Sequence, residues 1–194
     1  NLDLFAITHI NPIFKTMQAN MKSSTITLIL LACFCCKEIT FESPQPQGKK
    51  ALTSVPRDLR GKFLLLEGIA EPAMDTIIFE KNGYRLGFYD SAERARQPDP
   101  YDMGALSDTL VLKSYKGYYF FNFKTRKGWQ LRVIRPERNG NLIYMDMGKE
   151  GIGFDDYLRE LNSYVRVDSF KLDDNMVYRI DPTSSELVEL IEKG

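Results

Sequence analysis

Asp75-Thr76-Ile77-Ile78-Phe79-Glu80-Lys81-Asn82-Gly83-Tyr84-Arg85-Leu86-Gly87-Phe88 is the stretch that decides the fold. It places two short runs rich in aliphatic and aromatic residues on either side of an Asn-Gly pair. Asn-Gly between such runs is the strongest short signal for a β-hairpin, because both residues tolerate positive φ. The stretch therefore predicts two antiparallel strands, over 75–80 and 84–88, joined by a tight turn at 81–83.

The same succession of strand, polar turn and strand returns further along the chain. A short apolar run over 61–67 predicts one more strand ahead of the hairpin, whereas the polar stretch 90–107 predicts a long connection. Three of the units begin with Asp followed by Thr or Ser. An Asp side chain that closes the preceding turn explains this repeat, and a repeated ligand motif is the alternative. The remaining strand pairs are predicted over 108–112 with 118–123, 129–133 with 142–145, and 168–172 with 176–180.

Two helices are expected late in the chain. Apolar residues recur at helical spacing over 154–161, and Thr183-Ser184-Ser185-Glu186 has the spacing of a capping box ahead of a second apolar face. The sequence therefore predicts a mainly β fold, an antiparallel meander of hairpins that forms a barrel or a sandwich with one or two short helices near the C-terminus. The apolar helical residues are Phe154, Tyr157, Leu158 and Leu161 in the first helix, and Leu187, Val188, Leu190 and Ile191 in the second.

A different pattern precedes the strands. Lys22 is followed by an apolar run from Ile26 to Ala32, which ends in Leu30-Leu31-Ala32-Cys33. A basic head, an apolar segment of about 7–15 residues and a small residue before the cleavage point are typical of a secretory signal peptide. The run is too short for a membrane span, which takes about 20 apolar residues.

Leu30-Leu31-Ala32-Cys33 resembles the lipobox of bacterial lipoproteins. The resemblance implies cleavage between Ala32 and Cys33 and lipidation of Cys33, which becomes the first mature residue. Leu31 is bulkier than the residues most common at the second lipobox position. Stable anchoring needs more than one acyl chain, and the lipoprotein modification supplies several. The expected location is the bacterial cell envelope, on the extracytoplasmic face of the outer or cytoplasmic membrane.

This signal divides the chain into four parts. Residues 1–20 are expected to be an upstream extension outside the fold, and 21–32 the signal peptide. Residues 33–54 are expected to form the lipid anchor and a flexible tether, because the stretch is polar and broken by proline. Residues 55–194 suit a single β-rich domain. Within it, Gly61-Lys62-Phe63 resembles the Gly-x-Trp opening of lipocalins, with Phe in place of Trp.

The mature chain offers little catalytic chemistry. The one histidine, His9, lies upstream of the signal, which leaves no Ser-His-Asp triad, no Cys–His pair and no common zinc site. Cys33, Cys35 and Cys36 lie together at the signal junction, so a disulfide framework is not expected in the domain. A metal-binding site formed by these cysteines is the less favoured interpretation. We therefore expect no catalytic residue, no metal and no cofactor.

Carboxylates are the remaining candidates for catalysis. A glycan hydrolase needs two positioned acids, and two groups can be nominated: Asp155-Asp156 with Glu160, and Asp173-Asp174. The first group lies at an expected helix start, where acidic residues stabilise the helix dipole. The second lies in an expected turn. The structural interpretation is therefore favoured for both groups.

Charge is balanced over the chain, with 26 basic and 26 acidic residues, so no overall field attracts nucleic acid. The segment from Thr109 to Pro136 lacks Asp and Glu but mixes basic with aromatic residues, a combination that can bind anionic ligands. Solvated turns are the favoured interpretation for most of its cations, and Trp129 is expected in the core. The basic residues of the segment are Lys113, Lys116, Lys124, Arg126, Lys127, Arg132 and Arg135.

These observations favour a non-catalytic, lipid-anchored envelope protein. It is expected to contact the membrane through its anchor and to bind a small apolar or anionic ligand, or an envelope partner protein, at the membrane surface. The alternatives are a purely structural or accessory lipoprotein and a carboxylate-dependent glycan hydrolase. A cavity of a few hundred Å3 with convergent polar groups would favour ligand binding.

Overall fold

The computed structural model of the 194-residue chain describes residues 38–64, 76–87, 103–146, 154–173 and 175–193. The upstream extension, the signal peptide and Cys33 lie outside the described residues. So do parts of the strands expected at 61–67 and 84–88, and most of the connection expected at 90–107.

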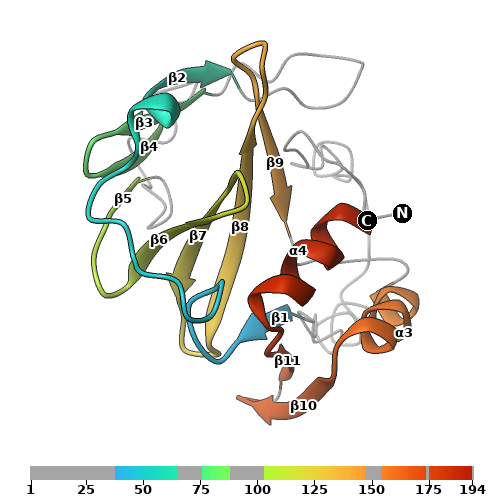
Figure 1. The fold of residues 1–194 in the computed structure, drawn as a ribbon. Helices are drawn as coiled ribbons and strands as arrows, with labels where there is room; N and C mark the ends of the chain where they lie inside the picture. The colour runs from blue at the N-terminus through green and yellow to red at the C-terminus, as the bar shows by residue number, and fades with distance from the viewer. Residues whose placement is uncertain (1–37, 65–75, 88–102, 147–153, 174, 194) are drawn as a thin grey trace, which may run out of the picture.

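The fold is mainly β, as predicted, and consists of two open sheets with two α-helices (Figure 1). The larger sheet has seven strands in the order β10-β11-β1-β8-β7-β6, with β9 also paired to β8; the smaller has the order β2-β3-β4-β5. The strands are β1 (Glu38–Phe41), β2 (Gly61–Leu64), β3 (Thr76–Glu80), β4 (Gly83–Gly87), β5 (Met103–Ala105), β6 (Leu110–Tyr115), β7 (Tyr118–Lys124), β8 (Trp129–Pro136), β9 (Leu142–Asp146), β10 (Val167–Leu172) and β11 (Asn175–Ile180); the helices are η2 (Arg57–Leu59), α3 (Phe154–Tyr164) and α4 (Ser184–Lys193).

The large sheet is covered on both faces. The small sheet packs on one face and forms a sandwich, and the two α-helices lie on the other side (Figure 1). Alternate residues of β7 therefore enter different cores: Tyr118 and Phe120 face the helices, whereas Phe121 faces the small sheet. This double coverage explains why β7 reads as an almost continuous apolar run rather than a strict alternation.

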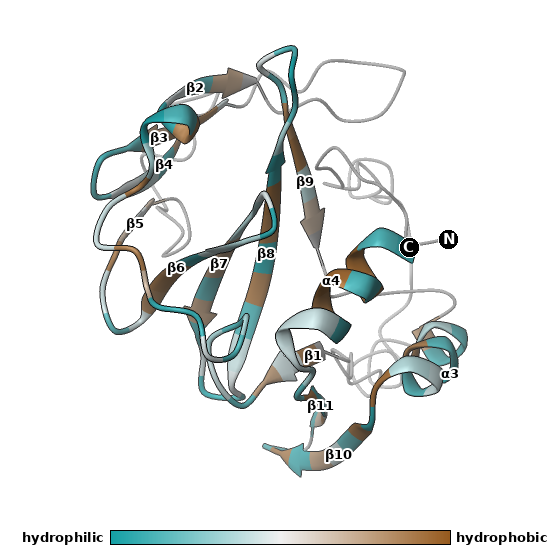
Figure 2. Cartoon of the chain, viewed as in Figure 1, coloured by the Kyte–Doolittle hydropathy of each residue, from teal (hydrophilic) through white to brown (hydrophobic). Residues whose placement is uncertain are grey.

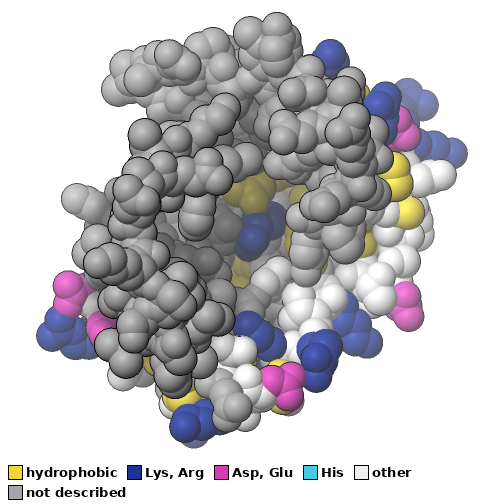
Figure 3. Space-filling view, turned by 180° about the vertical axis from the view of Figure 1, so that it is seen from behind, with side chains coloured by type: hydrophobic (Ala, Val, Ile, Leu, Met, Phe, Trp, Pro, Cys, Tyr) yellow, Lys and Arg dark blue, Asp and Glu magenta, His cyan; other side chains and the backbone are white. Residues whose placement is uncertain are grey.

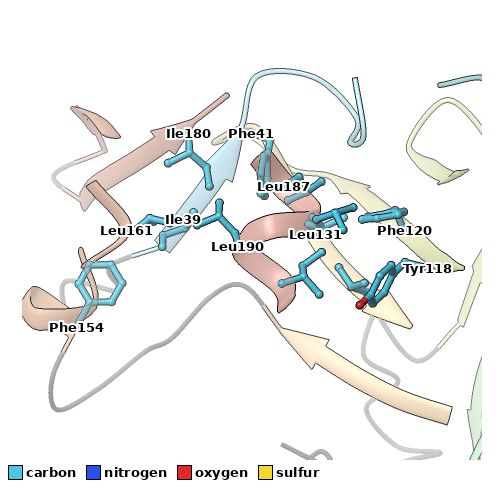
Figure 4. Close-up of a cluster of buried hydrophobic side chains, with 13 residues drawn as sticks. Ile39, Phe41, Tyr118, Phe120, Leu131, Phe154, Leu161, Ile180, Leu187 and Leu190 are labelled. Atoms are coloured by element: carbon cyan, nitrogen blue, oxygen red, sulfur yellow. The ribbon is translucent and has the colours of Figure 1, made fainter. Parts of the chain in front are cut away.

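Both expected helices are present at the expected residues. Phe154 and Leu161 of α3 are buried, and four apolar residues of α4 pack onto the large sheet (Figures 2 and 4). The capping box of α4 is reciprocal: the Thr183 backbone N–H donates to Glu186 Oε2 at 2.8 Å, and the Glu186 N–H donates to Thr183 Oγ1 at 3.3 Å. The first of these hydrogen bonds also lowers the pKa of the Glu186 carboxyl.

The expectation of a flexible tether over 33–54 is wrong for its described part, residues 38–54. β1 lies inside the large sheet, parallel to β11 over Glu38–Phe41 and antiparallel to β8 where Phe41 faces Trp129. Phe41 and Gln45 are fully buried. The fold thus includes residues well ahead of position 55, and its parallel pair departs from a purely antiparallel meander.

The predicted hairpins are confirmed, but the physical reason given for the first one is wrong. Glu80 pairs with Gly83 across a turn at Lys81 and Asn82, and neither Asn82 nor Gly83 has positive φ. Gly83 is needed for a close approach, since an added Cβ would lie 1.8 Å from the Gly104 carbonyl oxygen of β5. β5 itself falls in the stretch expected to be a polar connection.

An apolar cavity between the two sheets

A cavity of about 380 Å3 lies between the small sheet and the adjoining face of the large sheet. Five strands form it, and most of its wall is aromatic or aliphatic. In the space-filling view from behind, hydrophobic side chains lie next to a basic side chain near the middle of the molecule (Figure 3). We call this space the inter-sheet cavity; its lining residues are Ile77 and Phe79 of β3, Tyr84 and Leu86 of β4, Phe121 and Phe123 of β7, Gln130, Arg132 and Ile134 of β8, and Tyr144 of β9.

Strand register explains why these residues meet. On the small sheet, Ile77 faces Leu86 across the ladder and Phe79 faces Tyr84. On the large sheet, Phe121 faces Arg132, Phe123 faces Gln130, and Ile134 faces Tyr144. Directly opposed residues of an antiparallel pair project from the same face. Cross-strand pairs on two sheets therefore line the cavity from opposite sides.

Aromatic contacts hold the two sheets together beside the cavity. The ring of Phe79 lies 5.4 Å from that of Phe121, and the ring of Tyr84 lies 6.0 Å from that of Phe123, edge to face. Gly104 makes room for Tyr84, because an added Cβ there would lie 2.7 Å from the tyrosine ring. These contacts fix the wall of the cavity on rigid strands rather than on loops.

The polar groups of the lining come mainly from one strand. Gln130 and Arg132 stand two residues apart on β8 and so point to the same face. Arg132 Nη1 donates a hydrogen bond to the Leu131 carbonyl oxygen at 3.2 Å. In the ladder to β9, Arg132 stands opposite Asp146. The cavity thus combines a mainly apolar wall with a guanidinium and an amide on β8.

Tyr119 lies on the same face of β7 as the cavity residues but makes a different contact. Its hydroxyl donates to Asp58 Oδ2 at 2.8 Å. Burial, together with this hydrogen bond and the negative charge of Asp58, raises the pKa of Tyr119 to about 12. The hydroxyl therefore stays protonated at neutral pH and anchors η2 against the inter-sheet core.

The basic residues of 109–136 lie in different environments. Lys113 is buried and donates to the carbonyl oxygens of Pro44 and Pro46, and burial lowers its pKa. Arg126 is exposed in a turn and pairs with Asp173 at 2.8 Å. Arg132 alone among the seven lines the cavity. Trp129 is half-buried against the helix-side core, in agreement with the core interpretation.

The carboxylates nominated from the sequence lie away from the cavity. Asp155 and Asp156 are exposed in the first turn of α3, as expected of acids at a helix start, and Glu160 is exposed on the same helix. Asp173 is exposed in the turn between β10 and β11, and Asp174 lies outside the described residues. The structure therefore does not bring these acids together across a cleft within its described part.

In the described part of the chain, no three His, Cys, Asp or Glu side chains gather in a way that would hold a metal ion. Across the same residues, neither helix is long and apolar enough to cross a membrane. The cysteines of the signal junction lie outside this range.

Comparison with known proteins gives no assignment. No protein-family model, curated protein or solved structure matches this chain. The inter-sheet cavity is therefore interpreted from its own residues.

Sequence reasoning missed the cavity, although one signal for it was present. Trp129-Gln130-Leu131-Arg132-Val133 alternates cleanly between an apolar and a polar face. The apolar face of this strand does face the helix-side core, but the polar face lies under the small sheet. This polar face supplies Gln130 and Arg132 to the lining of the cavity.

Proposed function

We propose that this chain is a non-catalytic, lipid-anchored protein of the bacterial envelope that binds a small, largely apolar ligand in the inter-sheet cavity. The cavity carries the proposal. Ligand sites typically have volumes of about 300–1,000 Å3 and combine apolar walls with a few placed polar groups. A volume of about 380 Å3, eight aromatic or aliphatic lining residues and the pair Gln130 and Arg132 fit this description.

The alternatives have less support. A partner-binding role calls for a broad apolar surface, yet the large hydrophobic residues exposed in the described ranges are Met103 and Tyr164 only. A hydrolase calls for two acids facing each other across a cleft, and none of the described lining residues of the cavity is acidic.

The lipobox supports the proposed anchor, and β1 sets its geometry. Residues 34–37 separate Cys33 from the start of β1 at Glu38. An extended chain covers at most about 3.6 Å per residue, so this link spans roughly 18 Å. The domain would therefore stand close to the membrane.

Cys33→Ser is expected to release the protein from membranes into the soluble fraction, because the serine cannot take the thioether-linked lipid. Fractionation of cells followed by immunoblotting measures this directly. Cys35→Ser is the matched control and should leave the protein with the membranes. Unchanged sedimentation of the Cys33→Ser variant would refute lipidation at this position.

Ile77→Trp is expected to fill the cavity and to weaken binding of the neutral apolar dye Nile red by about tenfold or more, since no room remains for the dye. Fluorescence titration of the purified protein measures the effect. Ile78→Trp adds the same side chain to the opposite face of β3 and should leave dye binding unchanged. Absence of dye binding to the unaltered protein would reject the proposed function.

A further inference from the structure

The polarity of the inter-sheet cavity is concentrated on one side. Its two long polar side chains, Gln130 and Arg132, come from a single strand. The small sheet across from them contributes apolar side chains and one tyrosine: Ile77, Phe79, Leu86 and Tyr84. A ligand that fills this space meets hydrocarbon on one side and hydrogen-bond donors on the other. This arrangement suits an amphipathic molecule, with an apolar body and one polar head.

The charge of the lining selects among possible heads. Arg132 is the only residue with a formal charge among the described lining residues, and it is half-buried. A guanidinium matches a carboxylate through two parallel N–H···O bonds and is always protonated. A single guanidinium among the described lining residues therefore favours a singly charged, planar carboxylate over a doubly charged phosphate.

Arg132 already interacts with other groups of the protein, among them the Leu131 carbonyl oxygen. A guanidinium has five N–H donors arranged as a fork, so it can donate to protein groups and to a ligand oxygen together. Gln130 supplies a further N–H donor two residues away on the same face. A carboxylate head therefore has two donor groups available on β8.

We propose that the ligand of the inter-sheet cavity is a medium-chain monocarboxylate, with its hydrocarbon chain against the small sheet and its carboxylate at Arg132 and Gln130. This inference rests on the proposed function, because it names the ligand class of the same cavity. The modest volume of about 380 Å3 favours a short apolar body over a long-chain lipid.

Displacement of Nile red from the full chain carrying Cys33→Ser, purified without detergent, tests the head group. Decanoate, decanol, decylamine and decyl phosphate share one chain and differ only at the head. At neutral pH we expect decanoate to displace the dye at a concentration about tenfold lower than the other three, because it alone matches the guanidinium in both charge and shape. Equal displacement by decanol would overturn the inference while leaving the cavity proposal intact.

Decylamine and decyl phosphate test the charge and the shape of the head. Stronger displacement by decylamine would show that Arg132 does not select the head, and stronger displacement by decyl phosphate would replace the carboxylate with a phosphate head. Either result overturns the assignment. A protein that does not bind Nile red at all would reject the proposed function and this inference together.

Arg132→Met should abolish the preference for decanoate over decanol. Arg135→Met is the matched control: it removes the same charge from the exposed, opposite face of β8 and should preserve the preference. Arg132→Lys keeps the positive charge but loses the paired N–H donors of the guanidinium, so an intermediate preference for decanoate over decanol is expected. Thermal unfolding establishes that each variant is folded. If folded Arg132→Met or folded Arg132→Lys preferred decanoate over decanol as strongly as the unaltered protein does, the assignment would be overturned.

Discussion

Phe41→Ala is expected to lower the free energy of unfolding by about 3–5 kcal/mol, the usual cost of truncating a buried phenylalanine. Phe41 is fully buried in the helix-side core, where its ring lies close to Leu187 of α4 (Figure 4). Its backbone lies between β11 and β8, so the side chain fills the core where the C-terminal hairpin joins the rest of the sheet. Small domains are stable by only about 5–15 kcal/mol, so the loss is a large share of the total.

Urea unfolding followed by far-UV circular dichroism measures this change. Glu42→Ala is the neighbouring control; Glu42 is exposed, and a change within about 0.5 kcal/mol is expected. A loss below about 1 kcal/mol for Phe41→Ala would place β1 outside the cooperative fold and would restore the tether interpretation of this segment.

Local pattern was sufficient for most of the strands. The hairpins β3–β4, β6–β7 and β10–β11 join neighbouring runs through short turns, and such pairing leaves its signal in adjacent residues. The turn at Lys116 and Gly117 shows the positive φ values, 50° and 82°, that were expected of Asn82 and Gly83. Hairpin positions were therefore predictable, whereas the backbone geometry of an individual turn was not.

β1 could not be predicted because its partners are distant in sequence. Four residues, Glu38–Phe41, pair with β11 and β8, and a polar, proline-rich stretch follows at once. Strand propensity depends strongly on tertiary context, so a short run with no local partner has almost no signal of its own. The composition of 43–50 indicated a tether, yet the groups that order its first half come from β6 and β7.

The cavity was missed for a related reason. Alternation along β8 separates its two faces, but it does not say which face is covered and by what. The small sheet covers the face that carries Gln130 and Arg132, and no residue close to them in the sequence indicates this. The chemistry of the site was visible in the sequence, and its location depended on the packing of two sheets.

Asn122→Ala is expected to destabilise the fold by about 2–4 kcal/mol, because it removes the partner of buried backbone groups at about 1–3 kcal/mol for each group left unsatisfied. Asn122 is fully buried on β7. Its Oδ1 accepts from the Gln45 N–H at 2.6 Å, and its Nδ2 donates to the Gln45 carbonyl oxygen at 2.8 Å. The Asn122 side chain thus makes the two backbone hydrogen bonds that a neighbouring strand would make, and holds the segment that follows β1.

Lys113 binds the same segment from β6, through the carbonyl oxygens of Pro44 and Pro46 at 2.6 and 3.0 Å. The two side chains act on adjacent residues, so Asn122→Ala should also loosen the Lys113 contacts. Hydrogen exchange of the Gln45 amide provides the specific measurement: its protection should fall in the variant by more than global stability accounts for. Ser114→Ala, an exposed change on β6, is the control and should alter neither quantity. Full protection of the Gln45 amide in Asn122→Ala would mean that the segment is held by the sheet alone, and that Asn122 only fills space.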